Sequence, residues 1–364
     1  MKSNYKKLAP YIRQIDERNK DLEVKRLLGV SIEKRFIESI ANTIGTDMTS
    51  YKIVRKGQFA YGPVTSRNGD KVSIALLEVD ECIISSSYIV FEITDTDTLL
   101  PEYLNLWFKR PEFDRYARFH SHGSAREIFD WEEMGNVMLP IPPIEEQQKI
   151  VNAYNAIEHR IAIKRQINDN LESQAFCVFK DLVALAEKGS ALSDIAFITM
   201  GTSPSGETLN QDGKGEIFYQ GKTDFGFRFP QVRLFTTDAI RYARKGDILM
   251  SVRAPVGDIN IANTNCAIGR GIASLRPKNG CYSFLYYTMK ELYFELNRFN
   301  DDGTVFGSIT KDDLFALSVH TVSDDLQRDF DKQIAPIDRA IFNNENEIYD
   351  LLSAKSLLLS RLAN

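Results

Sequence analysis

The chain has 364 residues, enough for two domains of ordinary size, each with its own hydrophobic core. Its hydrophobic fraction of 43% and charged fraction of 26% are typical of a soluble globular protein, and no run approaches the roughly 20 apolar residues of a membrane span. The four cysteines form no CxxC pair and the four histidines no cluster, which argues against a structural zinc and predicts a reducing, cytoplasmic location.

The formal net charge of −5 taken alone argues against nucleic acid as a partner, but the charges are unevenly distributed. Residues 213–276 contain ten Lys and Arg against five Asp and Glu, and residues 51–71 contain five against one. Local surfaces decide whether phosphates bind, so both segments are candidate nucleic-acid surfaces. For any single one of these residues, a solvated side chain on a strand is the simpler explanation.

Residues 1–142 are predicted to form a mixed α/β domain. Helical patterning near Leu8 to Leu28 is followed by short β-rich runs at 51–54 and 88–93, with turn signals at Gly57 and 67–70. A proline-rich stretch then ends the domain.

Residues 143–189 are predicted to form one unbroken helix. Pro143 suits a first helical turn, and Gly189 suits a position just after the last. Such a helix extends about 65 Å, more than a small domain needs for its core. Polar Lys164 and Asn168 interrupt an apolar seam that is typical of a coiled coil. The seam residues are Ile150, Tyr154, Ile157, Ile161, Leu171, Ala175, Val178 and Leu182.

A second mixed domain, 190–322, is rich in glycine and short strands, and a second long helix is predicted over 323–364. Asn344 occupies the place in this helix that Lys164 has in the first. Pro336 is expected to kink the helix or to mark its start. Its apolar seam residues are Phe330, Ile334, Ile337, Ile341, Ile348, Leu351, Leu358 and Leu362.

The two halves repeat one pattern about 180 residues apart. Trp107 and Phe119 coincide with Tyr287 and Phe299, and these aromatic pairs are predicted to lie in the cores. We therefore predict an α+β fold with two mixed α/β domains in a pseudo-two-fold repeat, separated by two long antiparallel coiled-coil helices. Two such readers at a fixed spacing suit two short DNA segments separated by unread base pairs.

Two motifs imitate nucleotide-binding enzymes. In the run from Gly215 to Gly221-Lys222-Thr223, five residues separate the glycines where a phosphate loop has four. Asp224-Phe-Gly imitates a kinase element but has no His-Arg-Asp partner, and the chain has no GxGxxG after a strand. His120 and His122 are too isolated for a catalytic or metal site. No catalytic, cofactor-binding or metal-binding residue is predicted.

Several runs resemble type I restriction–modification specificity (S) subunits. They are Leu192-Ser-Asp-Ile-Ala-Phe-Ile-Thr-Met-Gly, Gly246-Asp-Ile-Leu-Met-Ser-Val-Arg-Ala-Pro-Val-Gly-Asp, Val54-Arg-Lys-Gly-Gln-Phe-Ala-Tyr and Leu139-Pro-Ile-Pro-Pro-Ile-Glu-Glu-Gln-Gln-Lys. The resemblance covers essentially the whole chain. The second spacer departs from it, because Leu317-Ser-Val-His-Thr-Val-Ser lacks the paired prolines.

The resemblance implies a non-catalytic subunit that binds double-stranded DNA. Residues 1–142 and 190–322 would be target-recognition domains, each reading half of a bipartite asymmetric site. The spacer helices 143–189 and 323–364 would set the gap and dock two methyltransferase (M) subunits. S-adenosylmethionine, ATP and Mg are expected in the partner subunits, M and, where they join, restriction (R) subunits, and not in this chain.

The residues expected to touch DNA are Arg, Lys, Gln, Asn, Ser and Thr in loops that face a groove. The candidates are Ser66, Arg67, Asn68, Lys71, Thr202, Ser203, Gln220, Lys222, Arg228, Arg253 and Arg270. A structural pair with Asp258 or with a carbonyl oxygen is the competing explanation for Arg253, and a plain hairpin turn competes for 67–70.

Three other functions fit parts of the pattern. A scaffold with two protein-binding modules on a coiled coil would lack the basic loops. A nucleotide-dependent enzyme fragment would need a usable phosphate loop. A type II system, with methyltransferase and nuclease fused in the partner, would use a specificity subunit with the same sequence features.

Overall fold

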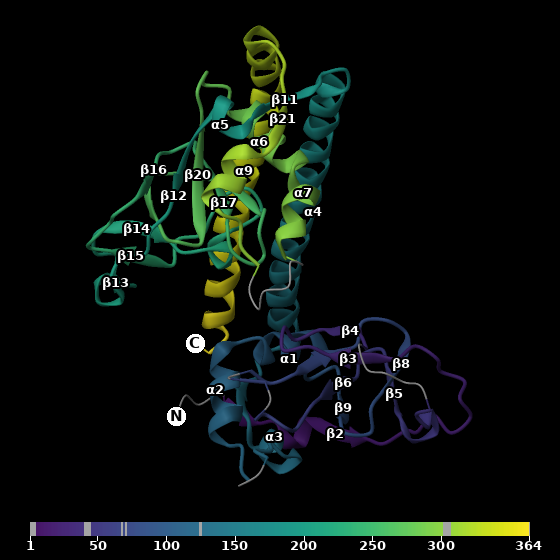
Figure 1. Cartoon of the computed structure of the whole chain (residues 1–364). Coiled ribbons are helices and arrows are strands. Elements are labelled where there is room, and N and C mark those ends of the chain that lie inside the picture. Colours follow the sequence, from purple (N-terminus) through teal and green to yellow (C-terminus); the bar gives the residue numbers. More distant parts are fainter. Residues whose placement is uncertain are drawn as a thin grey trace. The chain divides into compact units, whose positions relative to one another are not determined.

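The computed structural model describes residues 5–39, 45–66, 68–69, 71–123, 126–300 and 307–363. The chain divides into two compact units, unit 1 with residues 1–160 and 351–364, and unit 2 with residues 161–350. Each unit contains a mixed α/β domain, and the long helix α4 (Ile144–Val183) joins the two domains (Figure 1).

Unit 1 has ten described strands and three short α-helices besides the long ones. The strands are β1 Tyr5–Lys7, β2 Ile12–Ile15, β3 Leu28–Val30, β4 Phe36–Glu38, β5 Lys52–Arg55, β6 Phe59–Tyr61, β7 Ile74–Leu76, β8 Glu81–Ile84, β9 Ile89–Ile93 and β10 Met138–Pro140. The helices are α1 Pro101–Phe108, α2 Pro111–Phe119 and α3 Trp131–Asn136, with 3-10 turns η1 Ala9–Tyr11 and η2 Met48–Ser50.

Unit 2 follows with eleven described strands. They are β11 Lys188–Ala191, β12 Ala196–Met200, β13 Leu209–Asn210, β14 Glu216–Tyr219, β15 Leu234–Thr236, β16 Tyr242–Ala243, β17 Ile248–Ser251, β18 Ile259–Ile261, β19 Cys266–Ile268, β20 Ile272–Pro277 and β21 Ser318–His320. The helices are α5 Leu192–Ile195, α6 Tyr282–Glu291, α7 Tyr293–Asn297, α8 Lys311–Ala316 and the long α9 Asp324–Arg361, with turns η3 Gly206–Thr208, η4 Lys222–Asp224 and η5 Arg298–Asn300.

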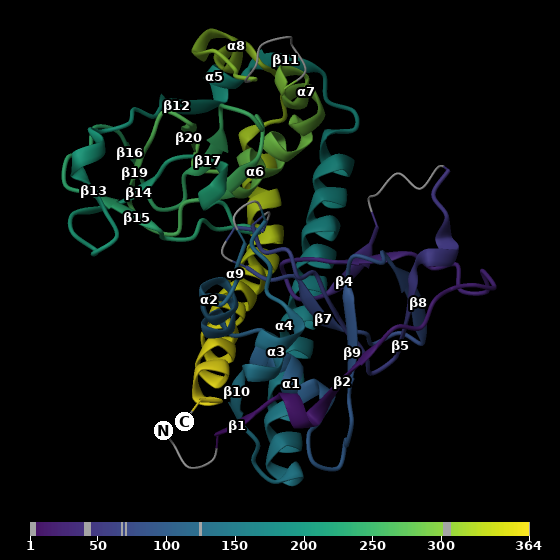
Figure 2. The same cartoon turned by 90° about the horizontal axis from the view of Figure 1, so that it is seen from below.

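A four-stranded sheet has the same order of strands in both units. It runs β2-β9-β6-β7 in unit 1 and β12-β20-β17-β18 in unit 2, with every neighbour antiparallel. A two-stranded ribbon then closes each domain, β1 with β10 and β11 with β21. The units differ outside this frame. Unit 2 adds the five-stranded sheet β13-β15-β14-β19-β16, whose strands β13, β14 and β15 lie on the side of the unit away from α4 (Figure 1 and Figure 2).

The long helices pack against each other in both units. In unit 2, Lys164 Nζ donates to Asn344 Oδ1 at 2.8 Å, and the rings of Phe179 and Phe330 lie 5.9 Å apart. Residue numbers rise along α4 as they fall along α9, so the two segments are antiparallel there. In unit 1, Val151 and Tyr154 of α4 share the core with Leu359 of α9.

Two expectations about elements were wrong. Residues 8–28 form no long helix, because Ile12 and Ile15 pair with Ile93 and Val90 in the sheet and Pro10 opens a 3-10 turn instead. Helix α4 ends at Val183 and not at Lys188, since Lys188–Ala191 pairs with β21. Helix α9 begins at Asp324, close to the predicted residue 323, and continues through Pro336, so the proline does not mark its start and the kink stays a prediction.

Of the two aromatic pairs expected in the cores, one pair is buried and the other is not. Trp107 and Tyr287 are buried, at 6% and 0% exposure, as predicted. Phe119 is 81% exposed and lies outside the core, because it is the last residue of α2 and the helix presents it to solvent. Phe299 packs half-buried against the core of unit 2.

Candidate nucleic-acid interface

A hollow of about 770 Å³ in unit 2 brings together residues from four separate loops. The loops follow β12, β14 and β17, and the fourth joins β19 to β20. The lining residues are Ser203, Gln220, Gly221, Lys222, Thr223, Arg253, Ala254, Pro255, Arg270 and Gly271. Five of the seven candidates predicted in this domain therefore lie around one hollow.

Glycines allow these loops to approach each other closely. A Cβ on Gly271 would lie 2.5 Å from the carbonyl oxygen of Gln220, and a Cβ on Gly269 would lie 3.2 Å from its Cα. A Cβ on Gly201 would lie 2.1 Å from the carbonyl oxygen of Gly269. Since real Cβ atoms do not come this close to backbone, only glycine fits at Gly201 and Gly271 without a backbone shift.

Asp224 fixes the backbone of the Gln220–Thr223 loop through hydrogen bonds. Its buried carboxylate accepts hydrogen bonds from the Gln220 N–H at 2.6 Å and the Gly221 N–H at 3.3 Å. Its other oxygen accepts from Arg233 Nε at 2.8 Å. Because the carboxylate fixes the backbone, the side chains of Gln220 and Lys222 project from a set position.

Two arginines supply the free positive charge of the hollow. Arg253 and Arg270 are exposed, and neither guanidinium has an ion-pair partner among the described residues. The Arg270 backbone N–H donates to Ser203 Oγ at 3.3 Å, and the Lys222 ammonium lies 2.5 Å from the Asp258 carboxylate. Asp258 therefore pairs with Lys222, and among the ion pairs of the described residues there is none between Asp258 and Arg253. Two unpaired guanidiniums suit bidentate contacts with a phosphate or with a guanine edge.

Two further candidates of this domain lie elsewhere. Thr202 is exposed and its N–H donates to Ile268 O at 3.1 Å, one residue away from the lining of the hollow. Arg228 is removed from the candidate interface, because its side chain is 1% exposed and its guanidinium is bound by Asp338 and Glu172.

The candidates of unit 1 lie in the connection from β6 to β7, which has the same place in its sheet as the connection from β17 to β18 that carries Arg253. Ser66 and Lys71 are exposed there and Asn68 is half-buried, while Arg67 lies outside the described residues. Lys71 Nζ lies 2.7 Å from Glu33 Oε1. This loop is tied down where Thr65 N donates to Glu127 O at 3.0 Å.

Sequence reasoning missed half of the lining of the hollow. Gly221 and Thr223 belong to the run that was set aside as an imitation phosphate loop, and Ala254 and Pro255 follow directly after Arg253. A signal was present, since every missed residue except Pro255 adjoins a predicted one in the sequence. Four of the five missed residues have no side chain that donates a hydrogen bond, whereas only Arg, Lys, Gln, Asn, Ser and Thr were expected to touch DNA.

The described part of the chain contains no group of three or more His, Cys, Asp or Glu side chains placed to hold a metal ion. Among the helices of that part, none is long and apolar enough to cross a membrane.

Two segments, residues 35–173 and 188–352, match the family model of the type I restriction modification DNA specificity domain. The matches span most of both halves of the chain. The protein belongs to the type I restriction–modification DNA specificity family.

Individual relatives agree with this assignment. A protein of Methanocaldococcus jannaschii that bears the name MjaX specificity subunit of a type I restriction enzyme is 28% identical over 252 residues, 63% of this chain and 59% of the relative. The HindI specificity subunit of Haemophilus influenzae is 26% identical over 173 residues, 46% of this chain and 37% of the relative. The alignments thus span less than two thirds of either relative.

Among solved structures, the type I restriction–modification S subunit from M. genitalium is 17% identical, with a TM-score of 0.60 over 99% of this chain and 96% of that one. At this identity the likeness concerns the fold.

Proposed function

We propose that this chain is the non-catalytic DNA specificity subunit of a type I restriction–modification system. The observation that carries the proposal is the double match to the DNA specificity domain, once in each half of the chain. Each half of the chain contains a four-stranded sheet with the same strand order, and the candidate contact loops follow the equivalent strands β6 and β17. Each recognition domain would read one half of a bipartite asymmetric site, with residues 1–142 and 190–322 as the readers.

The hollow of unit 2 is the proposed base-reading surface of the second domain. Arg253 and Arg270 would approach guanine or phosphate, and Gln220 would approach adenine, the pairings that the major groove favours. In the first domain the Ser66–Lys71 loop would do the same. Double-stranded DNA is thus the proposed ligand of both surfaces.

The segments 143–189 and 323–364, which contain helices α4 and α9, are the proposed spacer, an antiparallel coiled-coil pair in a pseudo-two-fold repeat. The contacts of Lys164 and Asn168 with Asn344 support an antiparallel register, because the polar step of one helix meets that of the other. Ile163 and Ile167 of α4 are exposed at 41% and 40% and supply an apolar surface for a partner. Two methyltransferase subunits carrying S-adenosylmethionine would dock on such surfaces, and restriction subunits using ATP and Mg would join them.

The experiment that tests this function is a genome-wide map of methylated adenines with and without the gene. We expect one bipartite motif, with two specified parts and a fixed gap, to lose methylation completely when the gene is deleted. A map that does not change would contradict the proposal and favour a scaffold without a DNA role. In parallel, the chain together with its methyltransferase should shift a duplex carrying the motif, with an affinity that falls steeply as salt rises.

A further inference from the structure

Arg228 is a buried arginine with a side chain 1% exposed, and it follows, five residues later in the chain, the residues 220–223 that line the hollow. The segment between them is fixed by Asn260, whose Oδ1 accepts from Gly226 N at 3.0 Å. Ile261 N donates to the Arg228 carbonyl oxygen at 2.8 Å. One stiff segment, residues 220–228, therefore has the hollow at one end and a buried cation at the other.

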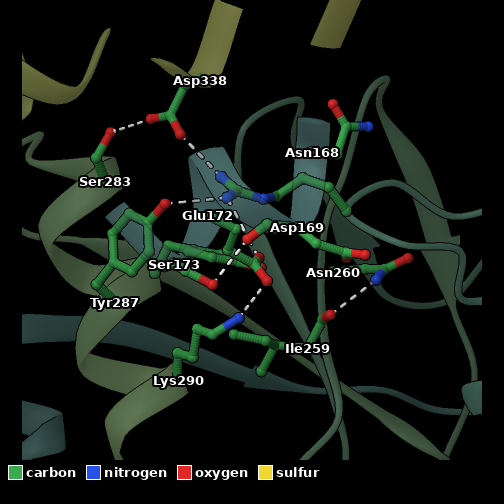
Figure 3. Close-up of polar contacts among 12 residues, drawn as sticks. Asn168, Asp169, Glu172, Ser173, Ile259, Asn260, Ser283, Tyr287, Lys290 and Asp338 are labelled. Carbon is green, nitrogen blue, oxygen red and sulfur yellow. Dashed lines mark hydrogen bonds and ion pairs between the residues drawn. The ribbon is translucent and has the colours of Figure 1, made fainter. Parts of the chain in front are cut away.

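The Arg228 guanidinium connects three helices of unit 2. Nη1 donates to Asp338 Oδ1 of α9 at 2.8 Å, and Nη2 lies 3.3 Å from Glu172 Oε1 of α4. Nη2 also donates to the hydroxyl of Tyr287 on α6 at 3.0 Å (Figure 3). Because the guanidinium is planar and forked, it reaches both long helices at once, which a lysine ammonium cannot do as well.

The two carboxylates that bind Arg228 are themselves held in place. Ser283 Oγ donates to Asp338 Oδ2 at 2.6 Å, and Lys290 forms an ion pair with Glu172 (Figure 3). The cluster thus contains two cations and two carboxylates. Burial by itself lowers the pKa of Arg228, but the surrounding groups, Tyr286, Tyr287, Asp338 and Glu172, raise it above the ordinary value, so the side chain stays charged.

Helix α6 is attached to α9 independently of Arg228. The Asp331 carboxylate accepts from Phe284 N at 2.8 Å and from Ser283 N at 3.2 Å. The ring of Phe284 lies 6.2 Å from that of Phe330 on α9, within an apolar core. What Arg228 adds is therefore a connection between the long helices and the segment that lines the hollow.

We propose that Arg228 is a positioning residue for DNA reading, which fixes the lining segment 220–223 relative to the pair of long helices. This inference rests on the proposed function. If the helices set the distance between two half-sites, the segment that reads the DNA must be held rigidly on them. A loosely held segment would reach half-sites at more than one distance. Arg228 then determines how strictly the protein requires a fixed number of base pairs between the half-sites.

The test compares duplexes that carry the mapped motif with its natural gap or with one base pair inserted. One base pair moves a half-site by about 3.4 Å along the helix. We expect the wild-type complex with its methyltransferase to lose about 100-fold in affinity on insertion, the range of a lost base-specific contact, and the Arg228→Met complex to lose only about 10-fold. If Arg228→Met does not fold, Asp338→Asn is the second variant, because it removes only the charged partner of Arg228 on α9. This variant should also lose less affinity than wild type when one base pair is inserted.

Arg276→Met is the matched control. Arg276 binds the buried Asp247 at 2.7 Å inside the four-stranded sheet, and no contact among the described residues links it to α4 or α9. This variant should be destabilised as well but should keep the wild-type penalty for an inserted base pair. If wild type binds the natural duplex and both Arg228→Met and Asp338→Asn keep the full penalty, the inference is overturned while the function stands. If wild type binds no duplex with the motif, the proposed function itself fails.

Discussion

At the scale of single residues, Arg253 and Arg270 are expected to dominate recognition by unit 2, because they are the charged side chains of the hollow that no carboxylate of the described residues neutralises. Each substitution by alanine should weaken binding of the second half-site by about 1–3 kcal/mol and relax its sequence requirement. The measurement is a titration with duplexes altered in one half-site at a time. Lys214→Ala, which removes an exposed cation outside the hollow, should leave the titration unchanged.

Glu172 gives the cluster around Arg228 a dependence on pH. Burial by itself raises the pKa of Glu172, but Lys290 and Arg228 together lower it by more than burial raises it. The pKa of Glu172 in the folded protein therefore lies below the ordinary 4.5. A carboxyl whose folded pKa is lowered stabilises the fold fully above pH 4.5, and this contribution is lost as the pH falls through the folded value.

Glu172→Gln should therefore destabilise unit 2 by about 3 kcal/mol at pH 7, since the buried Arg228 and the half-buried Lys290 both lose a charged partner, and by progressively less below pH 4.5. Both tryptophans, Trp107 and Trp131, lie in unit 1, so fluorescence does not report on unit 2. Hydrogen exchange in α6 is the suitable measurement. A difference between wild type and variant that stays constant from pH 7 to pH 3.5 would contradict the role of this carboxylate.

Arg228 illustrates what could not be read from the sequence at this scale. It lies in the same arginine-rich stretch as Arg253, but its side chain is buried whereas that of Arg253 is exposed. Its acceptors are 56 and 110 residues away in the chain, on helices that only the tertiary structure brings together. In contrast, Arg253 follows a fully buried strand and could be placed at the end of a sheet from its pattern alone.

At the scale of elements, the glycines between the loops of the hollow are expected to be irreplaceable. Gly271→Ala would place a Cβ 2.5 Å from the Gln220 carbonyl oxygen, and Gly201→Ala would place one 2.1 Å from the Gly269 carbonyl oxygen. Because backbone must move in both cases, we expect a loss of about 1–3 kcal/mol in stability and weaker binding of the second half-site. Thermal unfolding and duplex titration measure the two effects.

Gly206→Ala is the control for these substitutions, since nothing lies within 4 Å of its would-be Cβ. A Gly271→Ala protein with wild-type stability and binding would show that the loops have room to separate, and the hollow would then not be the rigid reading surface that we propose.

The long helices were the elements best predicted from sequence. The start of α4 at Ile144, with Glu145 and Glu146 in the first turn, follows from local capping chemistry. The end of α4 and the region 8–28 were not predictable in this way, because pairing with a distant strand overrode local preference. Lys188 pairs with His320, and Ile12 pairs with Ile93, both far along the chain.

At the scale of the whole molecule, the proposed division into two readers predicts modular specificity. Replacing residues 190–322 with the equivalent segment of a family member that reads another site should change one half of the methylated motif and leave the other half and the gap intact. Methylation mapping of the strain with the hybrid gene is the measurement. A hybrid that alters both halves together would contradict modular reading.

The far end of helix α9 completes the domain that is made first. Leu359 and Leu362 belong to the core of unit 1, and the hydroxyl of Tyr5 donates to the Ala363 carbonyl oxygen at 2.8 Å. During synthesis on the ribosome, residues 5–142 therefore emerge well before Leu359 and Leu362, which complete their apolar core. That core stays partly open until those leucines have emerged, and chaperone dependence should be greater for unit 1 than for unit 2.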